Sequence, residues 1–268
     1  MKETAYAKLN LALHVRQRRE DGYHELETLF AFCEHGDVLS AEPASRDEVR
    51  TVGEFGGKVG DPGDNLVARA LGALPHTNGL VITLEKNLPV AAGLGGGSAD
   101  AGAVFRIVEH MHALPGDWLD RALKLGADVP ACVRSEMAVG RGVGEELAPL
   151  DNDLAGTPVL LINPRVALST GPVFKAWDGE DRGALPEGTA REVALNGRND
   201  LEAPAIAICP VIADVLEALR ETAPLLARMS GSGATCFALY DDEAARNSAA
   251  DAISKTHPDW WQMATALR

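Results

Sequence analysis

The sequence is poor in positive charge and in paired cysteines. Its 25 lysines and arginines face 39 aspartates and glutamates, which gives a formal net charge of −14. Such a chain lacks the broad positive surface by which proteins bind nucleic acid, so nucleic acid is not an expected partner. No two of the four cysteines form a C-x-x-C pair, which argues against a zinc site and against a disulfide framework. We expect the cysteines to be reduced core residues.

Long apolar runs are also missing. No run of about 18 apolar residues occurs, and Met1–Tyr6 lacks the apolar stretch of a signal peptide. We therefore expect a cytoplasmic location and no membrane partner. The 268 residues, 46% hydrophobic and 24% charged, have the composition of a packed globular chain, and the length favours two medium domains over one large domain.

Two common nucleotide-binding fingerprints are absent. Gly56–Lys58 is followed by Val59, so this stretch does not end as a Walker A loop does. Gly93 and Gly95 are followed by Ser98 where a G-x-G-x-x-G loop would have its third glycine. The two nucleotide folds that carry these fingerprints therefore lose support.

A different glycine-rich segment is present at Pro89–Gly102. Within it, Gly93–Gly97 contains four glycines in five positions and comes directly before an apolar, helix-compatible stretch. Glycines let consecutive backbone N–H groups converge on one point, and a helix start adds unpaired N–H donors and the positive end of its dipole. A simple turn has no need of three successive glycines. The segment predicts a polyphosphate site, and the expected ligand is ATP.

Hydrophobic periodicity predicts a β-rich first part followed by alternating helices and strands. Strands are expected at 5–15, 25–33, 37–41, 48–52, 79–84, 158–162 and 260–267, with a strand pair around 140–144 and a strand after the small-residue loop that begins at 229. Helices are expected after a cap at Asp64 or Asn65, and at 98–114, 117–125, 200–222 and 242–255. Pro204 and Pro210 limit how regular the helix over 200–222 can be. The turn-prone stretch 151–156 predicts one domain over 1–153 and a second over 154–268.

Two charged residues in apolar surroundings are candidates for catalysis. Phosphoryl transfer needs charge neutralisation and usually a carboxylate that takes the proton of the acceptor. Lys8 lies within an otherwise apolar strand, and Asp128 is flanked by small and apolar residues. Each has an ordinary alternative, since a strand lysine often reaches solvent and an isolated aspartate often belongs to a turn or a helix cap. His24 follows Tyr23 at the end of a turn, where such a pair more often consists of packing or surface residues than of ligands.

Three segments of the chain, taken in order, resemble the GHMP family of small-molecule kinases. They are Ala7–Leu11 together with Asp21–Leu26, then Leu88–Ala101, and then Met229–Phe237. The resemblance spans nearly the whole chain, and the glycine-rich segment combined with the Ser-Gly-Ser-Gly stretch is specific for this superfamily. Asp-Gly-Tyr-His at 21–24 resembles the subfamily that acts on a cytidine diphosphate-linked methylerythritol in the non-mevalonate isoprenoid pathway.

The resemblance implies a fold and a reaction. The fold would be α+β with two lobes, a ribosomal-protein-like β-α nucleotide lobe at the N-terminus and a ferredoxin-like lobe at the C-terminus. The reaction would transfer phosphate from ATP, with Mg²⁺, to the C2 hydroxyl of the substrate and release ADP. The expected partner is this small-molecule substrate, without nucleic acid or membrane, and a weak homodimer is left open.

The resemblance also implies roles for individual residues. Asp128 would be the general base, Lys8 would stabilise its carboxylate and the charge of the transition state, and Ser98 would help to hold magnesium. The residues implied around ATP are Asn65, Leu66, Lys86, Pro89, Val90, Ala91, Ala92, Gly93, Leu94, Gly95, Gly96, Gly97 and Ser98. The residues implied around the substrate are Asn10 at the acceptor end, Tyr23 and Phe174 stacked on cytosine, His24 at the edge of the base, and Thr170.

Two other functions stay open. Another kinase of the superfamily, acting on mevalonate, homoserine or a sugar, would keep Lys8, the glycine-rich segment and Asp128 but would have no use for Tyr23 and His24. A non-catalytic ATP-binding sensor would tolerate the loss of Asp128, whereas this chain retains both Lys8 and Asp128. The segment 178–194 matches no pattern of the family.

Overall fold

The computed structural model describes residues 1–61 and 65–268, which form two compact units. The first unit consists of Met1–Lys8, His35–Val90 and Gly95–Ser135, and the second of Leu9–Glu34, Ala91–Leu94 and Glu136–Arg268. The predicted domain boundary divides the chain once, at 153, whereas each of these units consists of three separate segments of the chain. The cause is that strands β1 (Lys2–Arg18) and β2 (His24–Ala44) are long enough to belong to both units.

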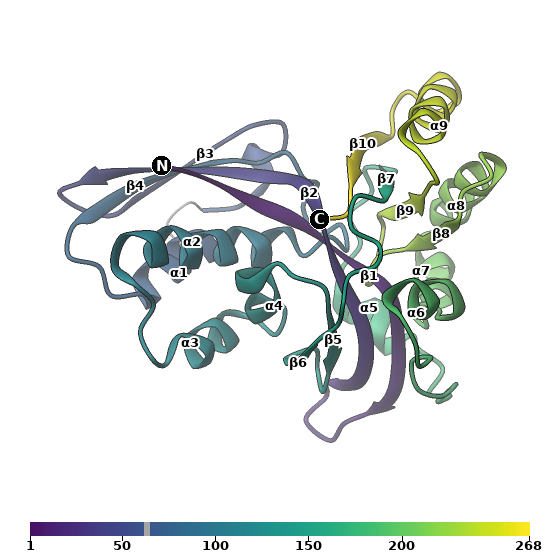
Figure 1. Ribbon diagram of the computed structural model, residues 1–268, viewed down its shortest axis with the longest axis horizontal. Helices are drawn as coiled ribbons and strands as arrows, with labels where there is room; N and C mark the ends of the chain where they lie inside the picture. The colour runs from purple at the N-terminus through teal and green to yellow at the C-terminus, as the bar shows by residue number, and fades with distance from the viewer. Residues whose placement is uncertain (62–64) are drawn as a thin grey trace. The chain divides into compact units, whose positions relative to one another are not determined.

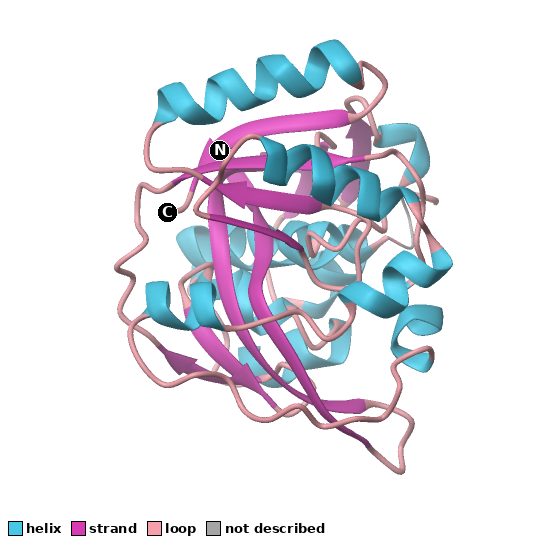
Figure 2. Cartoon of the chain, turned by 90° about the vertical axis from the view of Figure 1, so that its right-hand side faces the viewer, coloured by secondary structure: helices cyan, strands magenta, loops and turns pink. Residues whose placement is uncertain are grey.

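The turn between β1 and β2 fixes how these two strands pair. The N–H of Arg19 donates to the carbonyl of Tyr23 at 2.8 Å, and so short a connection makes the paired strands antiparallel. The strands expected at 25–33 and 37–41 are parts of the single strand β2, so their predicted separation is wrong. Helices and strands are mixed along the chain, as the cyan and magenta segments of Figure 2 show, and the predicted α+β class is confirmed.

The first unit packs helices against one side of its strands (Figure 1). Strand β3 (Glu48–Val52) is parallel to β4 (Gly79–Glu85), which is antiparallel to the second half of β2. A short 3-10 helix, η1 (Gly56–Lys58), follows β3. The helices are α1 (Leu66–Ala73), α2 (Gly96–His112), α3 (Trp118–Leu125) and α4 (Val129–Arg134). Helix α2 contacts the other three, and its apolar side chains Val104, Phe105, Ile107 and Val108 are fully buried.

The starts of α1 and α2 follow from local sequence. The side-chain oxygen of Asn65 accepts the N–H of Ala68 at 3.0 Å, which confirms the predicted cap of α1. The alternative cap, Asp64, lies outside the described residues. Helix α2 begins at Gly96 rather than at the predicted Ser98, because the preceding Gly95 adopts the left-handed conformation, with φ 60°, that turns the chain into the helix.

The second unit contains a four-stranded antiparallel sheet in the order β10-β7-β9-β8. These strands are β7 (Pro158–Asn163), β8 (Leu226–Met229), β9 (Cys236–Leu239) and β10 (Trp261–Ala266). Helices α8 (Val211–Glu221) and α9 (Glu243–Thr256) pack against this sheet, and their buried side chains share one apolar core with it. The chain order of these six elements is that of a ferredoxin-like unit. Strands β5 (Ala138–Arg141) and β6 (Glu146–Pro149) form a hairpin whose first strand pairs with Thr28–Phe30 of β2.

Three shorter helices complete the second unit: α5 (Thr170–Lys175), α6 (Ala190–Asn196) and α7 (Glu202–Ile208). The helical stretch predicted over 200–222 divides into α7 and α8 at Pro210, the N-cap residue of α8 and one of the two prolines expected to limit its regularity. Helix α6 lies in the stretch without a family pattern, and Thr189 and Glu192 form a capping box at its start.

The cysteines agree with the expectation from the sequence. All four cysteines are buried and free, as expected for reduced core residues. Among the helices of residues 1–61 and 65–268, none is long and apolar enough to cross a membrane.

Candidate active site

Lys8 and Asp128 form an ion pair within the first unit. The Lys8 Nζ atom lies 3.0 Å from Asp128 Oδ2, and the side chains are 5% and 34% exposed. Lys8 is therefore buried and does not reach solvent. Asp128 directly precedes α4 but makes no capping hydrogen bond to it, so the ordinary explanation of this aspartate as a cap does not hold. The ammonium group orients a carboxylate that remains accessible.

The start of α2 lies beside this pair. The first intrahelical bond runs from the N–H of Ala99 to the carbonyl of Gly95, at 2.8 Å, so the N–H groups of residues 96–98 precede the hydrogen-bonded turns of the helix. A Cβ atom on Gly95 would lie 2.8 Å from Cε of Lys8. The missing side chain thus lets the lysine pack against the helix start, where backbone donors and the helix dipole favour an anion.

Ser98 lies near the turn that precedes Asp128. Its Oγ atom is 4.0 Å from where a Cβ atom of Gly126 would stand. Magnesium prefers oxygen ligands, and at kinase sites it is bound by few protein groups together with substrate phosphates. A hydroxyl group in the first turn of α2 fits that mode. Within the described part of the chain, no cluster of three or more His, Cys, Asp or Glu side chains offers a metal site made by protein alone.

Asn65 and Leu66 lie beside the glycine-rich helix start, whereas Lys86 is enclosed. A Cβ atom on Gly97 would meet Leu66 Cδ1 at 3.1 Å. The Asn65 side-chain nitrogen is buried and has no hydrogen-bond partner among the described residues, so it has a donor to offer a nucleoside. The Lys86 ammonium group instead lies between Asp37 and Asp100, and the side chain is only 3% exposed. The geometry therefore gives no support to the predicted contact of Lys86 with the nucleoside.

The second unit holds the middle of the glycine-rich segment, Ala91–Leu94. Ser230 Oγ donates to the carbonyl of Gly93 at 2.9 Å and accepts the N–H of Asn10 at 3.3 Å, while the N–H of Thr235 donates to the carbonyl of Ala92 at 3.1 Å. A side chain on Gly93 would collide with the Ser230 carbonyl, since its Cβ would lie 2.3 Å from that oxygen. Three segments that carry the family resemblance therefore meet at Ser230.

Asn10 is buried and partly committed to internal bonds. Its Nδ2 donates to Thr28 Oγ1 at 2.7 Å, and that hydroxyl donates to the carbonyl of Ala12 at 2.7 Å. Its Oδ1 lies 3.2 Å from where a Cβ atom of Gly231 would stand. These contacts hold the carboxamide in one orientation, so a role at the acceptor end of the substrate would fall to its oxygen.

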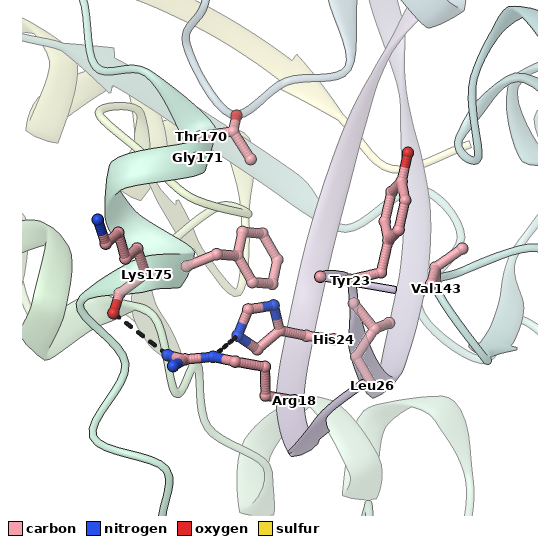
Figure 3. Close-up of a pocket in the computed structure, with 10 residues that line it drawn as sticks. Arg18, Tyr23, His24, Leu26, Val143, Thr170, Gly171 and Lys175 are labelled. Carbon is pink, nitrogen blue, oxygen red and sulfur yellow. Dashed lines mark hydrogen bonds between the residues drawn. The ribbon is translucent and has the colours of Figure 1, made fainter. Parts of the chain in front are cut away.

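The predicted substrate residues Tyr23, His24, Thr170 and Phe174 line one cavity of about 460 Å³ in the second unit (Figure 3). A volume of this size fits a small organic ligand. Although the chain is strongly acidic, none of the described residues that line this cavity is acidic, and two of them are cations. The other lining residues are Arg18, Gly22, Leu26, Val143, Gly171 and Lys175.

His24 is a buried residue of the cavity lining, and its hydrogen bond determines which ring nitrogen carries the proton. Its ring centroid lies 5.1 Å from that of Phe174 and 5.8 Å from that of Trp177. Arg18 Nε donates to His24 Nε2 at 3.3 Å (Figure 3), so Nε2 accepts and Nδ1 carries the proton. Burial and the neighbouring Arg18 charge lower the pKa of His24, which keeps the ring neutral near pH 7. Tyr23, by contrast, is 62% exposed at the rim.

Sequence reasoning missed the two cations of the cavity. Arg18 Nη2 also donates to the backbone carbonyl of Lys175 at 3.3 Å, which joins the end of β1 to α5 (Figure 3). Arg18 stands just before the Asp21–Leu26 motif, and Lys175 directly follows Phe174. Basic residues next to predicted binding residues stand out in an acidic chain, so the sequence could have indicated both cations.

Comparison with known proteins agrees with this geometry. A family model described as the GHMP kinases N terminal domain matches residues 65–136, and a model described as GHMP kinases C terminal matches residues 183–259. The matched ranges contain Asp128 and the start of α2 in the first case, and Ser230 in the second.

Whole-chain relatives extend the match. The 4-diphosphocytidyl-2-C-methyl-D-erythritol kinase of Erythrobacter litoralis is 65% identical, over 99% of both chains. That of Novosphingobium aromaticivorans is 66% identical, over 100% of this chain and 93% of the relative. A crystal structure of 4-(cytidine 5'-diphospho)-2C-methyl-D-erythritol kinase superposes with a TM-score of 0.83 at 36% identity, over 99% of both chains. The chain thus belongs to the 4-diphosphocytidyl-2-C-methyl-D-erythritol kinase family of the GHMP kinases.

Proposed function

We propose that this chain transfers the γ-phosphoryl group of ATP to the C2 hydroxyl of 4-diphosphocytidyl-2-C-methyl-D-erythritol. ADP and the 2-phosphate are the products, in the non-mevalonate isoprenoid pathway. Membership of the family supports the reaction. The observation that carries the proposal is the Lys8–Asp128 ion pair beside the start of α2, because it combines an accessible carboxylate, a buried cation and backbone donors for phosphate.

Asp128 acts as the general base. It accepts the proton of the acceptor hydroxyl as the new P–O bond forms, while the bond from the γ-phosphorus to the bridging oxygen of ADP breaks. Lys8 orients the carboxylate and neutralises negative charge that develops on the transferred group. Its burial keeps this charge from being screened by water.

The start of α2 binds the phosphates of ATP through the N–H groups of residues 96–98. The buried amide nitrogen of Asn65, which has no hydrogen-bond partner within residues 1–61 and 65–268, and the side chain of Leu66 accommodate the nucleoside. Ser98 contributes its hydroxyl group to Mg²⁺, which neutralises phosphate charge when it is bound.

The cavity of the second unit binds the cytidine part of the substrate. Phe174 and Tyr23 offer aromatic faces to the base, and the Nδ1–H of His24 offers a donor to one of its acceptor atoms. Arg18 and Lys175 provide positive charge for the diphosphate. We also propose functional domains at 1–153 and 154–268, since the two matched family models fall on either side of that boundary. A cytoplasmic location belongs to the same proposal, because the reaction consumes ATP.

The test is ADP release by the purified protein with Mg²⁺-ATP and four acceptors: the cytidylyl substrate, mevalonate, homoserine and galactose. The proposal predicts turnover with the cytidylyl substrate alone. Turnover with another acceptor would keep a kinase but discard the roles given to His24 and Phe174. Tight ATP binding without turnover on any acceptor would favour a nucleotide sensor.

A further inference from the structure

Asp37, Lys86 and Asp100 form a buried charge cluster in the first unit, which we call the Lys86 cluster. Asp37 belongs to β2, Lys86 follows the last residue of β4, and Asp100 lies near the start of α2. The three residues are 0%, 3% and 2% exposed. Charged side chains are rarely buried to this degree unless they are paired, and the reaction described above uses none of these three groups.

The contacts of the cluster tie α2 to the segment that leads into Pro89. Asp37 Oδ1 accepts the N–H groups of Asn87 and Leu88 at 2.6 and 2.8 Å, and Asp37 Oδ2 accepts from the Lys86 ammonium group. Lys86 Nζ also donates to Asp100 Oδ2 at 2.7 Å. The other oxygen of Asp100 is buried without a hydrogen-bond partner in the described part of the chain, so Lys86 holds this carboxylate.

The ammonium group lies directly behind the first residue of α2. A Cβ atom on Gly96 would stand 3.1 Å from Lys86 Nζ and 3.8 Å from Asp37 Oδ2. The positive charge is therefore at the end of the helix that presents its unbonded N–H groups and the positive end of its dipole. A side chain at position 96 would push this ammonium group back by a few tenths of an ångström.

The lysine is charged in this environment. Burial lowers the pKa of Lys86, but the attraction of Asp100 and Asp37 outweighs that effect, so the pKa is raised above its usual value. Burial also raises the pKa of Asp100 to about 7. Because two carboxylates face one ammonium group, the cluster adds no net positive charge, and the contribution of Lys86 is to hold these groups together behind the helix start.

We propose that Lys86 is a positioning residue for the polyphosphate of ATP: held by Asp37 and Asp100, its ammonium group fixes the start of α2 and so keeps the phosphate-binding N–H groups in one orientation. It does so without touching the nucleoside, in contrast to the contact expected from the family resemblance. The inference rests on the proposed function, because it takes ATP as the ligand at this helix start.

The test compares two variants that differ in the ammonium group alone. Asp100→Asn keeps an oxygen acceptor for Lys86 and removes one negative charge, whereas Lys86→Gln/Asp100→Asn replaces the ammonium group by a neutral amide as well. Dissociation constants for ATP and for adenosine are measured by calorimetry, with folding checked by thermal denaturation. The control is Lys124→Gln, which removes an exposed positive charge from α3 of the same unit.

The proposal predicts that Asp100→Asn binds ATP at least as tightly as the wild type, since the anchor persists and a repulsive charge is gone. The double variant should bind ATP at least about ten-fold more weakly than Asp100→Asn, with adenosine affinity changed less than about two-fold. Lys124→Gln should change neither constant.

Equal weakening of ATP and adenosine in the double variant would overturn the proposal, because it would indicate a nucleoside contact or a general loss of structure. If the double variant does not fold, folded Asp100→Asn still decides, since about ten-fold weaker ATP binding by this variant alone contradicts the proposal. These binding constants do not depend on turnover, so failure of the proposed reaction would be recognised separately, in the acceptor assay on the wild type.

Discussion

Lys8 Nζ stands 3.0 Å from Asp128 Oδ2, with the lysine buried and the aspartate one-third exposed. A buried cation next to an accessible carboxylate gives the base one fixed orientation. Lys8→Met removes the charge while keeping most of the side-chain volume. We expect kcat to fall by about 100-fold or more, because charge stabilisation of the transition state is lost.

The control for Lys8→Met is Arg121→Met, which breaks the exposed Arg121–Asp117 ion pair of the same unit. Exposed pairs contribute about 1 kcal/mol or less to stability, so this variant should keep full turnover. Thermal denaturation shows whether either variant is folded. If Lys8→Met lost folding and turnover to the same extent, its assigned role in the reaction would be wrong.

Gly95→Ala should lower both the stability of the protein and its kcat. Gly95 has a φ of 60°, and its added Cβ would lie 2.8 Å from Lys8 Cε. The left-handed conformation costs an L-residue roughly 1–2 kcal/mol, and displacement of Lys8 should lower kcat by about ten-fold or more. Steady-state kinetics and a melting curve measure the two effects.

The matched variant is Gly72→Ala, in helix α1 of the same unit. A Cβ atom there would meet nothing within 4 Å. Since alanine is favoured over glycine in a helix interior, this change should leave kcat intact and stabilise the protein by about 0.5–1 kcal/mol. Similar kinetics for the two alanine variants would contradict the close packing of Lys8 on Gly95.

Phe174→Leu should affect one substrate and not the other. The ring of Phe174 packs 5.1 Å from His24 in the cavity, and its loss removes an aromatic face for the base. Stacking on an aromatic side chain contributes roughly 1–3 kcal/mol per base, so KM for the cytidylyl substrate should rise by about ten-fold. KM for ATP should not change, and Leu195→Ala, at an exposed position of the same unit, should change neither value. If only KM for ATP rose, Phe174 would act on ATP binding, and its assigned role in binding the cytidylyl substrate would be wrong.

His14 should make the fold sensitive to acid. The buried ring is bonded at both nitrogens, with Nδ1 donating to the carbonyl of Gly183 at 3.0 Å and Nε2 accepting the N–H of Arg198 at 3.1 Å. Burial, and then the Arg198 charge, lower its pKa below the usual value of 6.5. Below that pH the unfolded chain binds a proton that the folded chain does not bind, so stability falls as pH falls.

The loss amounts to at most about 1.4 kcal/mol per pH unit until the lowered folded pKa is reached. Free energies of unfolding at pH 7.5 and 5.5 measure it, and His14→Gln should show a smaller decrease between the two values than the wild type. His110→Gln serves as the control at an exposed histidine. A decrease of the same size in His14→Gln would assign the acid sensitivity to other groups.

The sequence allowed most elements to be predicted, and the errors have local causes. Helix α2 was expected from Ser98 onward, because the apolar periodicity begins after the glycines, yet Gly96 and Gly97 already belong to it. The helical stretch expected over 200–222 forms two helices that divide at Pro210, one of the prolines expected to limit its regularity. Helices α4 and α5 were not predicted, since a six-residue segment is too short to display a helical period.

The site was predictable residue by residue, but its pairings were not. Lys8 and Asp128 were each recognisable as a charge among apolar neighbours, whereas their contact depends on the packing of β1 and α4. Lys86 was assigned to the nucleoside by resemblance, and only tertiary structure reveals its enclosure by Asp37 and Asp100. Asp100 is a charged residue within a run of small residues, and this pattern could have indicated a buried ion pair at that position.

The most direct test of the account is a comparison of kcat for the wild type and Asp128→Asn, together with the dissociation constants of both for ATP and for the cytidylyl substrate. Asparagine keeps the shape of the side chain but cannot take the proton of the acceptor hydroxyl. The account predicts a fall in kcat of about 100- to 10,000-fold with both dissociation constants changed less than about three-fold. Turnover within about three-fold of the wild type would show that Asp128 is not the base and would contradict the central claim.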